Sequence, residues 1–193
     1  MLQDLPTPVC TICAGQGVMV LCCLAYLAWW GIAFRPEAEG SVVGGRAGLL
    51  LLLTFVLALA GVLLNIHGIK ELETVRNTVS IQTIMLTGAV VYILLLAATA
   101  GIFHRQPTTE LLLIVMWAVM EVAAVQAMYA AGAFTAYPFM LAAVIALATL
   151  IGLVAYMLYY ELDSVTAYYC GMVPLITDAI AMCVVVWYIT ERV

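Results

Sequence analysis

Charged side chains are what this sequence has least of. Only 9% of its 193 residues are Asp, Glu, Lys or Arg, whereas 67% are hydrophobic and the mean hydropathy is +1.18. A soluble domain covers itself with polar and charged groups, so this composition excludes one. The few basic residues form no cluster, which excludes binding to the phosphates of a nucleic acid. The composition predicts an integral membrane protein surrounded by the lipid bilayer.

Long apolar stretches fill almost the whole chain. A helix needs about 20 apolar residues to cross the hydrocarbon core of a bilayer. The sequence therefore predicts an all-α protein whose residues 1–193 form a single membrane domain of six transmembrane helices. We expect it in the cell (inner) membrane. The expected spans are 11–33, 45–67, 80–103, 110–132, 138–160 and 168–190. Lysine and arginine are divided equally between the two sides, so they do not set the orientation.

A short acidic motif occurs twice. ELETV at residues 71–75 returns ninety positions later as ELDSV at 161–165, and each copy closes an apolar run that contains a glycine. We therefore predict two related halves of three spans each, 8–105 and 109–193, with the second inverted in the membrane. The alternative is that two acidic turns between apolar helices resemble each other by chance.

Two acidic residues fall inside the expected spans. Glu121 lies near the middle of the fourth span with Trp117 one turn before it, and Asp178 lies in the sixth, four residues after Pro174. A carboxylate inside the bilayer is costly, so such residues are functional candidates by default. The alternatives are a neutral Glu121 hydrogen-bonded only for packing, and an Asp178 hydrated from the membrane surface.

The predicted repeat also pairs positions in the third and sixth spans. It lays Thr87 on Thr177 and Gly88 on Asp178. Inverted repeats place a binding site near the midplane where the halves meet. We therefore predict that Thr87, Thr177 and Asp178 approach one another, with Glu121 lining the same pathway for a solute or a proton.

The first span begins with a patch of small residues around a polar one. Gly15 and Gly17 allow another helix or a solute to approach the backbone closely, and Gln16 is the polar member of the patch. Gly88 has the same packing role in the third span. We place Gln16 among the pathway residues and the glycines at close helix contacts.

Two stretches resemble motifs of the acetate and succinate uptake transporter family. GIKE at 68–71, followed by Asn77-Thr78 and by Gly88, is similar to that family's G-x-x-E, G-N-T-F and S-Y-G run. PTPV at 6–9 with Gly15 is similar to its N-P-A-P-L-G-L motif. The sequence departs from the family at Leu5, Cys10 and 86–87.

The resemblance carries functional implications. It implies passive or proton-linked movement of small carboxylates through a six-helix protomer, with several protomers packed in a ring as a homo-oligomer. It also adds Asn77 to the pathway residues.

Cysteine and histidine suggest redox or metal chemistry only weakly. Cys10 and Cys13 form a C-x-x-C pair, but the two histidines, His67 and His104, lie on opposite membrane faces in the expected topology. Free cysteine packs as a small apolar residue. We expect no cofactor and no metal, with a thiol-redox or soft-metal role for the cysteines, such as the C-x-x-C pair, as the alternative.

The functional hypothesis follows from the buried acids. We expect a membrane transporter or channel for a small polar or anionic solute such as a short-chain carboxylate, linked to proton movement. The alternative is a non-transporting membrane subunit or assembly factor that packs against partner helices. No nucleophile–base spacing supports catalysis, so we expect that the protein is not an enzyme.

Overall fold

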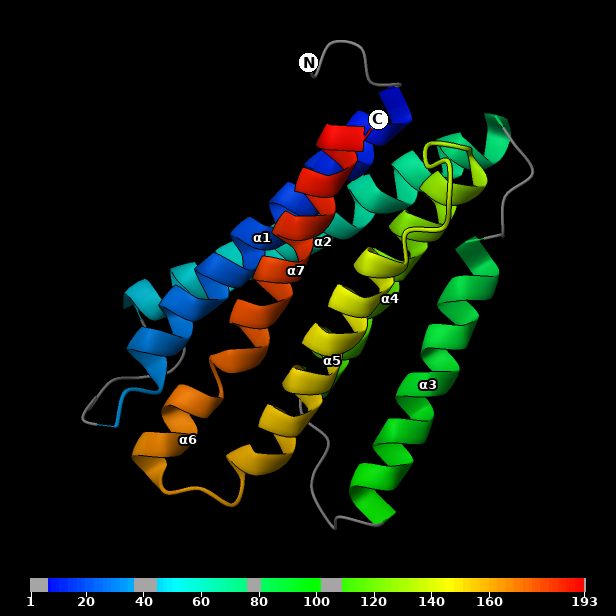
Figure 1. The fold of residues 1–193 in the computed structure, drawn as a ribbon. Helices are drawn as coiled ribbons and strands as arrows, with labels where there is room; N and C mark the ends of the chain where they lie inside the picture. Colours follow the sequence, from blue (N-terminus) through cyan, green and yellow to red (C-terminus); the bar gives the residue numbers. More distant parts are fainter. Residues whose placement is uncertain (1–6, 37–44, 76–80, 102–108, 193) are drawn as a thin grey trace.

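Helices make up nearly all of the described part of the chain. The computed structural model describes residues 7–36, 45–75, 81–101 and 109–192. Its helices are α1 (Thr7–Ala33), α2 (Gly45–Val75), α3 (Ile81–Gly101), α4 (Thr109–Ala130), α5 (Phe139–Tyr159), α6 (Ser164–Cys170) and α7 (Val173–Arg192) (Figure 1). α1 to α5, with α6 and α7 together, supply six segments long and apolar enough to cross a membrane, as predicted.

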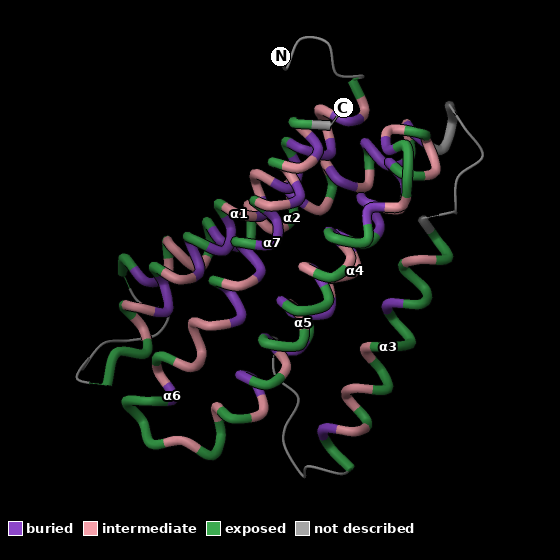
Figure 2. Tube along the Cα trace, in the orientation of Figure 1, coloured by how far each residue is buried: buried purple, intermediate pink, exposed green. Residues whose placement is uncertain are grey.

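The helices form a bundle in which α4 is central and α3 lies at the edge. α1 runs along α2 and also contacts α7, which in turn packs on α5 (Figure 1). α4 contacts α2, α3, α5 and α7. Of the most apolar stretch of α4, 61% is buried inside the bundle, whereas only 11% of the corresponding stretch of α3 is buried. Figure 2 shows α3 as mostly exposed. The exposed face of α3 is apolar, as a lipid-facing surface must be.

Glycines bring α1 and α2 into close contact. A Cβ atom on Gly15 would lie 2.6 Å from Asn65 Nδ2, and one on Gly61 would lie 2.7 Å from Met19 Cγ. Gly68 has an equally close contact with α1, where a Cβ would lie 2.8 Å from the carbonyl oxygen of Pro8. In a membrane such contacts replace the hydrophobic effect as a source of helix association.

The two other predicted packing glycines differ. A Cβ on Gly88 would lie 2.5 Å from Val119 Cγ2, so Gly88 is a close contact between α3 and α4. Gly17 is half-buried, and a Cβ there would meet nothing within 4 Å. The expectation of a close contact at Gly17 is therefore wrong, because its neighbour Gly15 occupies the face of α1 that meets α2.

The two predicted halves agree in some contacts and differ in others. Gly61 of α2 faces α1, and Gly152 of α5 faces Ile114 of α4, as equivalent positions would. The motif at 71–75 continues α2, however, whereas 161–165 forms a turn and then begins α6. α3 packs mainly on α4, whereas α7 packs on both α1 and α5. The six helices are thus confirmed, and the inverted repeat stays a prediction.

The sixth span is interrupted. α6 ends at Cys170 and α7 begins at Val173, with Pro174 in its first turn. Proline has no backbone N–H, so it cannot continue the hydrogen bonding of α6 into α7. Trp30 of α1 closes over this break: its ring contacts Gly171, and its Nε1 donates a hydrogen bond of 3.0 Å to the carbonyl oxygen of Tyr168.

Asp163 caps α6, and its removal should destabilise the end of the sixth span. Its carboxylate accepts a hydrogen bond of 3.2 Å from the Thr166 backbone N–H. Hydrogen bonding to the Thr166 side chain, and then to this backbone N–H, lowers the pKa of Asp163 below its ordinary value. The cap therefore stabilises the fold above the ordinary carboxyl pKa and is lost as the pH falls through the lowered one. We expect Asp163→Ala to lower the thermal unfolding temperature at pH 7, with a difference from wild type that shrinks below about pH 4.

Asp163→Asn serves as the control, because asparagine caps helices without titrating. It should stay close to wild type at pH 7. An Ala variant as stable as the Asn variant at pH 7 would contradict the capping role.

From the close contact between α1 and α2 we expect Gly15→Ala and Gly17→Ala, which each add one methyl group, to change the stability of the protein differently. Gly15→Ala must displace both the side chain and the backbone nitrogen of Asn65, which would lie 2.9 Å from the new Cβ. We expect a loss of about 1–3 kcal/mol of unfolding free energy. Gly17→Ala fills open space and should be neutral or slightly stabilising, because alanine is the better helix former. Unfolding of both variants in detergent micelles measures the difference, and equal stability would contradict the close contact.

Candidate functional site

The two acids predicted to be functional are both buried in the interior of the bundle. α4 carries Glu121 and α7 carries Asp178, and these side chains are only 2% and 5% exposed. Their carboxyl groups lie close enough to interact electrostatically. Glu121 Oε1 has no hydrogen-bond partner among the described residues. The bundle therefore holds two buried carboxyls of the same sign, one of them with a free acceptor.

A thiol and an indole complete this centre. Trp117, one turn before Glu121, donates a hydrogen bond of 3.1 Å from Nε1 to the sulfur of Cys23 on α1. Cys23 is itself within electrostatic reach of Glu121 and Asp178. Trp117 was predicted to flank Glu121, whereas Cys23 was missed. The only available signal for it was its position seven residues after Gln16, two turns further along the same face of α1.

Gln16 belongs to a second buried polar contact, between α1 and α2. Its side chain is fully buried, and Nε2 donates a hydrogen bond of 3.0 Å to Asn65 Oδ1. Asn65 Nδ2 in turn donates to the carbonyl oxygen of Gly61 at 2.9 Å. Gln16 Oε1 has no partner in the described part of the chain. Sequence reasoning missed Asn65, although an amide within an aliphatic span is the kind of residue that bridges helices.

The predicted threonines do not join the acids. Thr87 is exposed on α3, and its hydroxyl donates to the carbonyl oxygen of Thr83 at 2.9 Å. Thr177 donates to backbone carbonyls of its own helix, α7. α4 and α5 lie between α3 and α7 in Figure 1. The structure thus does not bring Thr87 to Thr177 or Asp178, because α3 packs at the edge of the bundle, and Asn77 lies outside the described residues.

A cavity of about 680 Å³ leads towards the acids. It lies between α1, α2 and α4, and its walls include Cys23, Trp117 and, from α7, Leu175. Trp117 and Leu175 each lie one helical turn before an acid, Glu121 and Asp178 respectively. Neither acid is part of the cavity wall.

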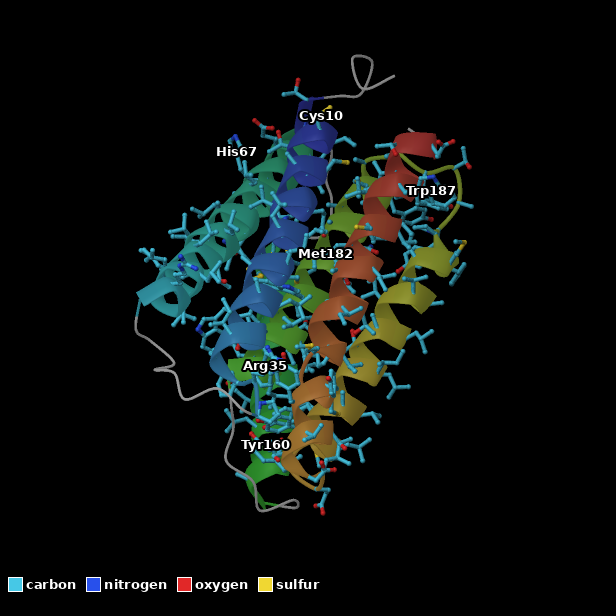
Figure 3. The ribbon with its side chains drawn as sticks, turned by 90° about the vertical axis from the view of Figure 1, so that its left-hand side faces the viewer. Cys10, Arg35, His67, Tyr160, Met182 and Trp187 are labelled. Atoms are coloured by element: carbon cyan, nitrogen blue, oxygen red, sulfur yellow. The ribbon has the colours of Figure 1, made fainter. Side chains whose placement is uncertain are left out.

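Met182 shows how deep in the bundle this centre lies. Met182 is fully buried on α7 and packs in one apolar cluster with Cys23 and Trp117. In Figure 3 it lies well inside the bundle, with Cys10 and His67 towards one end and Arg35 and Tyr160 towards the other. The acids therefore lie in the interior of the membrane-crossing part.

The described residues offer little metal or redox chemistry. No group of three or more His, Cys, Asp or Glu among them could hold a metal ion. His67 pairs with Glu71 at 3.3 Å near the exposed end of α2, and His104 lies outside the described residues. None of the six cysteines, all of which lie in the described part of the chain, forms a disulfide.

Comparisons of the chain with protein-family models, curated proteins and solved structures give no match. Of the resemblance to the acetate and succinate uptake transporters, the structure supports the six-helix membrane architecture. The protein is therefore a multi-span integral membrane protein with two buried carboxyl groups at its centre.

Proposed function

We propose that this protein is a proton-linked membrane transporter or channel for a small solute. The observation that carries this proposal is the burial of both Glu121 and Asp178 in the bundle, within electrostatic reach of each other. Ionisable side chains at membrane depth are costly and mark solute and proton pathways. Packing alone does not require two such groups at one place.

Proton coupling follows from the proximity of the two acids. Two ionised carboxylates in an apolar interior repel each other and are poorly solvated, so the pair favours holding at least one proton. Gain or loss of that proton changes the charge at the meeting point of α1, α4 and α7. Such a change is a natural driving force for movement of one helix against another.

The interrupted sixth span offers a place for that movement. Discontinuous membrane helices are common at transporter binding sites. α7 carries Asp178, and the break at Gly171 separates it from α6. Trp117 and Cys23, which are joined by a hydrogen bond, belong to the cavity wall, whereas the acids do not, and we interpret this arrangement as the closed state of the proposed pathway. A shift of α7 would open the connection.

The solute named by the family resemblance is a short-chain carboxylate. A carboxylate would be repelled by ionised Glu121 and Asp178, so it would require the pair to be protonated. The proposal therefore ties anion movement to acidic conditions.

A non-transporting membrane subunit is the second candidate, and a specific observation favours it. A groove of about 790 Å³ between α3, α4 and α5 has an almost wholly apolar lining that includes Val91, Val119 and Leu150. An apolar groove along a membrane helix suits a helix of a partner. Purified protein without flux in proteoliposomes, together with a stable complex in the native membrane, would favour this alternative.

Glu121→Gln tests the proposed function. One coupled proton gives up to about a tenfold change in rate per pH unit. Glutamine keeps the size and hydrogen bonding of the side chain but cannot titrate, so we expect flux in proteoliposomes to lose most of its pH dependence. Glu191→Gln, at the exposed end of α7, is the matched control and should behave as wild type. Unchanged pH dependence in the Glu121 variant would remove this residue from the mechanism.

A further inference from the structure

The buried charge beside the large cavity is of one sign. Glu121 and Asp178 are acidic, whereas no lysine or arginine occurs at 7–33, 109–130 or 173–191, the parts of α1, α4 and α7 that surround them. The basic side chains that the structure describes are exposed near helix ends: Arg35, Arg46 and Lys70. An anion at this site would meet two acids and no counter-charge, whereas a cation would be neutralised.

The cavity wall is rich in aromatic rings. Tyr26 and Trp29 of α1, Phe55 of α2 and Trp117 of α4 all line it. The faces of such rings attract organic cations, and most strongly so where water is excluded. The volume of about 680 Å³ lies within the range of pockets that hold drug-sized ligands.

The acids are near enough to act on a molecule in this cavity. Trp117 and Leu175 of the wall lie one turn from Glu121 and Asp178, and the Cys23 thiol of the wall is within electrostatic reach of both. Charges separated by a few ångströms of apolar protein interact far more strongly than in water. The acids therefore need not line the cavity to favour a positive charge within it.

We propose that the cavity between α1, α2 and α4 binds a lipophilic organic cation, whose charge is balanced by Glu121 and Asp178, in exchange for the proton of this pair. When the cation enters, the proton leaves the carboxyl group for water, so the net charge of the site is unchanged. This inference rests on the proposed function and names its solute class. It replaces the carboxylate by a cation.

The titratable groups around Glu121 and Asp178 support direct competition between the proton and the organic cation for this acid pair. Among the described residues, the thiol of Cys23 on α1 interacts electrostatically with the two acids, and Cys22 and Tyr26 of α1 are further titratable side chains of the cavity wall. The residues of α2 in the cavity wall carry no ionisable group, and α5, which packs on α4 and α7, contains no acidic or basic residue. Acidification should therefore act on cation binding through the acid pair itself.

A pair of ions of equal shape and opposite charge tests this inference. Tetraphenylphosphonium and tetraphenylborate each carry four phenyl rings on one central atom. We expect the purified protein in phosphatidylcholine nanodiscs, after subtraction of empty nanodiscs, to bind the cation saturably and at least about tenfold more tightly than the anion, a difference of about 1.4 kcal/mol. Binding of the cation should weaken from pH 8 to pH 5. Equal or tighter binding of tetraphenylborate, or no saturable binding of either ion, would overturn the inference.

Variants with matched controls locate the site. The double variant Glu121→Gln/Asp178→Asn should lose the preference for the cation, whereas Glu191→Gln should keep it. Trp117→Leu should weaken cation binding by about three- to thirtyfold, and Trp187→Leu, exposed on α7, should not. If a variant fails to fold, the pH dependence of cation binding to the wild type still decides the question. Full binding by a folded double variant would contradict the role of the acids.

The two proposals fail separately. Acid-sensitive cation binding without proton-linked flux would leave this site in place and refute transport. Proton-linked flux without cation binding would refute the cation and keep the transporter.

Discussion

The close contact between α1 and α2 is the constraint on which the rest of the bundle depends. Lipid is as apolar as the helix surfaces, so association relies on backbones that approach closely and on polar groups that bridge them. Gly15 and Gly61 provide the approach, and the hydrogen bond between Gln16 and Asn65 bridges the same interface. This contact determines the rotation of α1, and with it the direction in which α1 presents Cys23 to the centre.

The centre of the bundle places two acidic side chains in a largely apolar environment. Glu121 and Asp178 are buried in a bundle whose other described interior groups are overwhelmingly apolar. Their described polar neighbours include the thiol of Cys23, which accepts a hydrogen bond from the indole of Trp117. Neither neighbour can neutralise a carboxylate. On our proposals, the charge at this point responds to protons and to cations. A cavity with aromatic walls includes Trp117, one helical turn before Glu121.

The interruption of the sixth span links this centre to one end of the bundle. α6 is held by its cap at Asp163 and by Trp30, whose ring contacts Gly171 and whose indole donates to the carbonyl of Tyr168. α7 continues from the break to Asp178. On the proposed function, a change in charge at the acids would act on α7, a helix that the break separates from α6.

The sequence by itself determined the six spans and the two interior acids, because span length and apolar composition are local properties that need no partner. It did not determine which polar residues meet. The helices are apolar on nearly all sides, so no apolar stripe specifies their rotation or their neighbours. Only tertiary packing brought Glu121, Asp178 and Cys23 together, left Thr87 at the edge on α3, and paired Gln16 with Asn65. The physical reason is that in lipid a few close contacts between backbones, rather than amphipathic faces, decide how helices assemble.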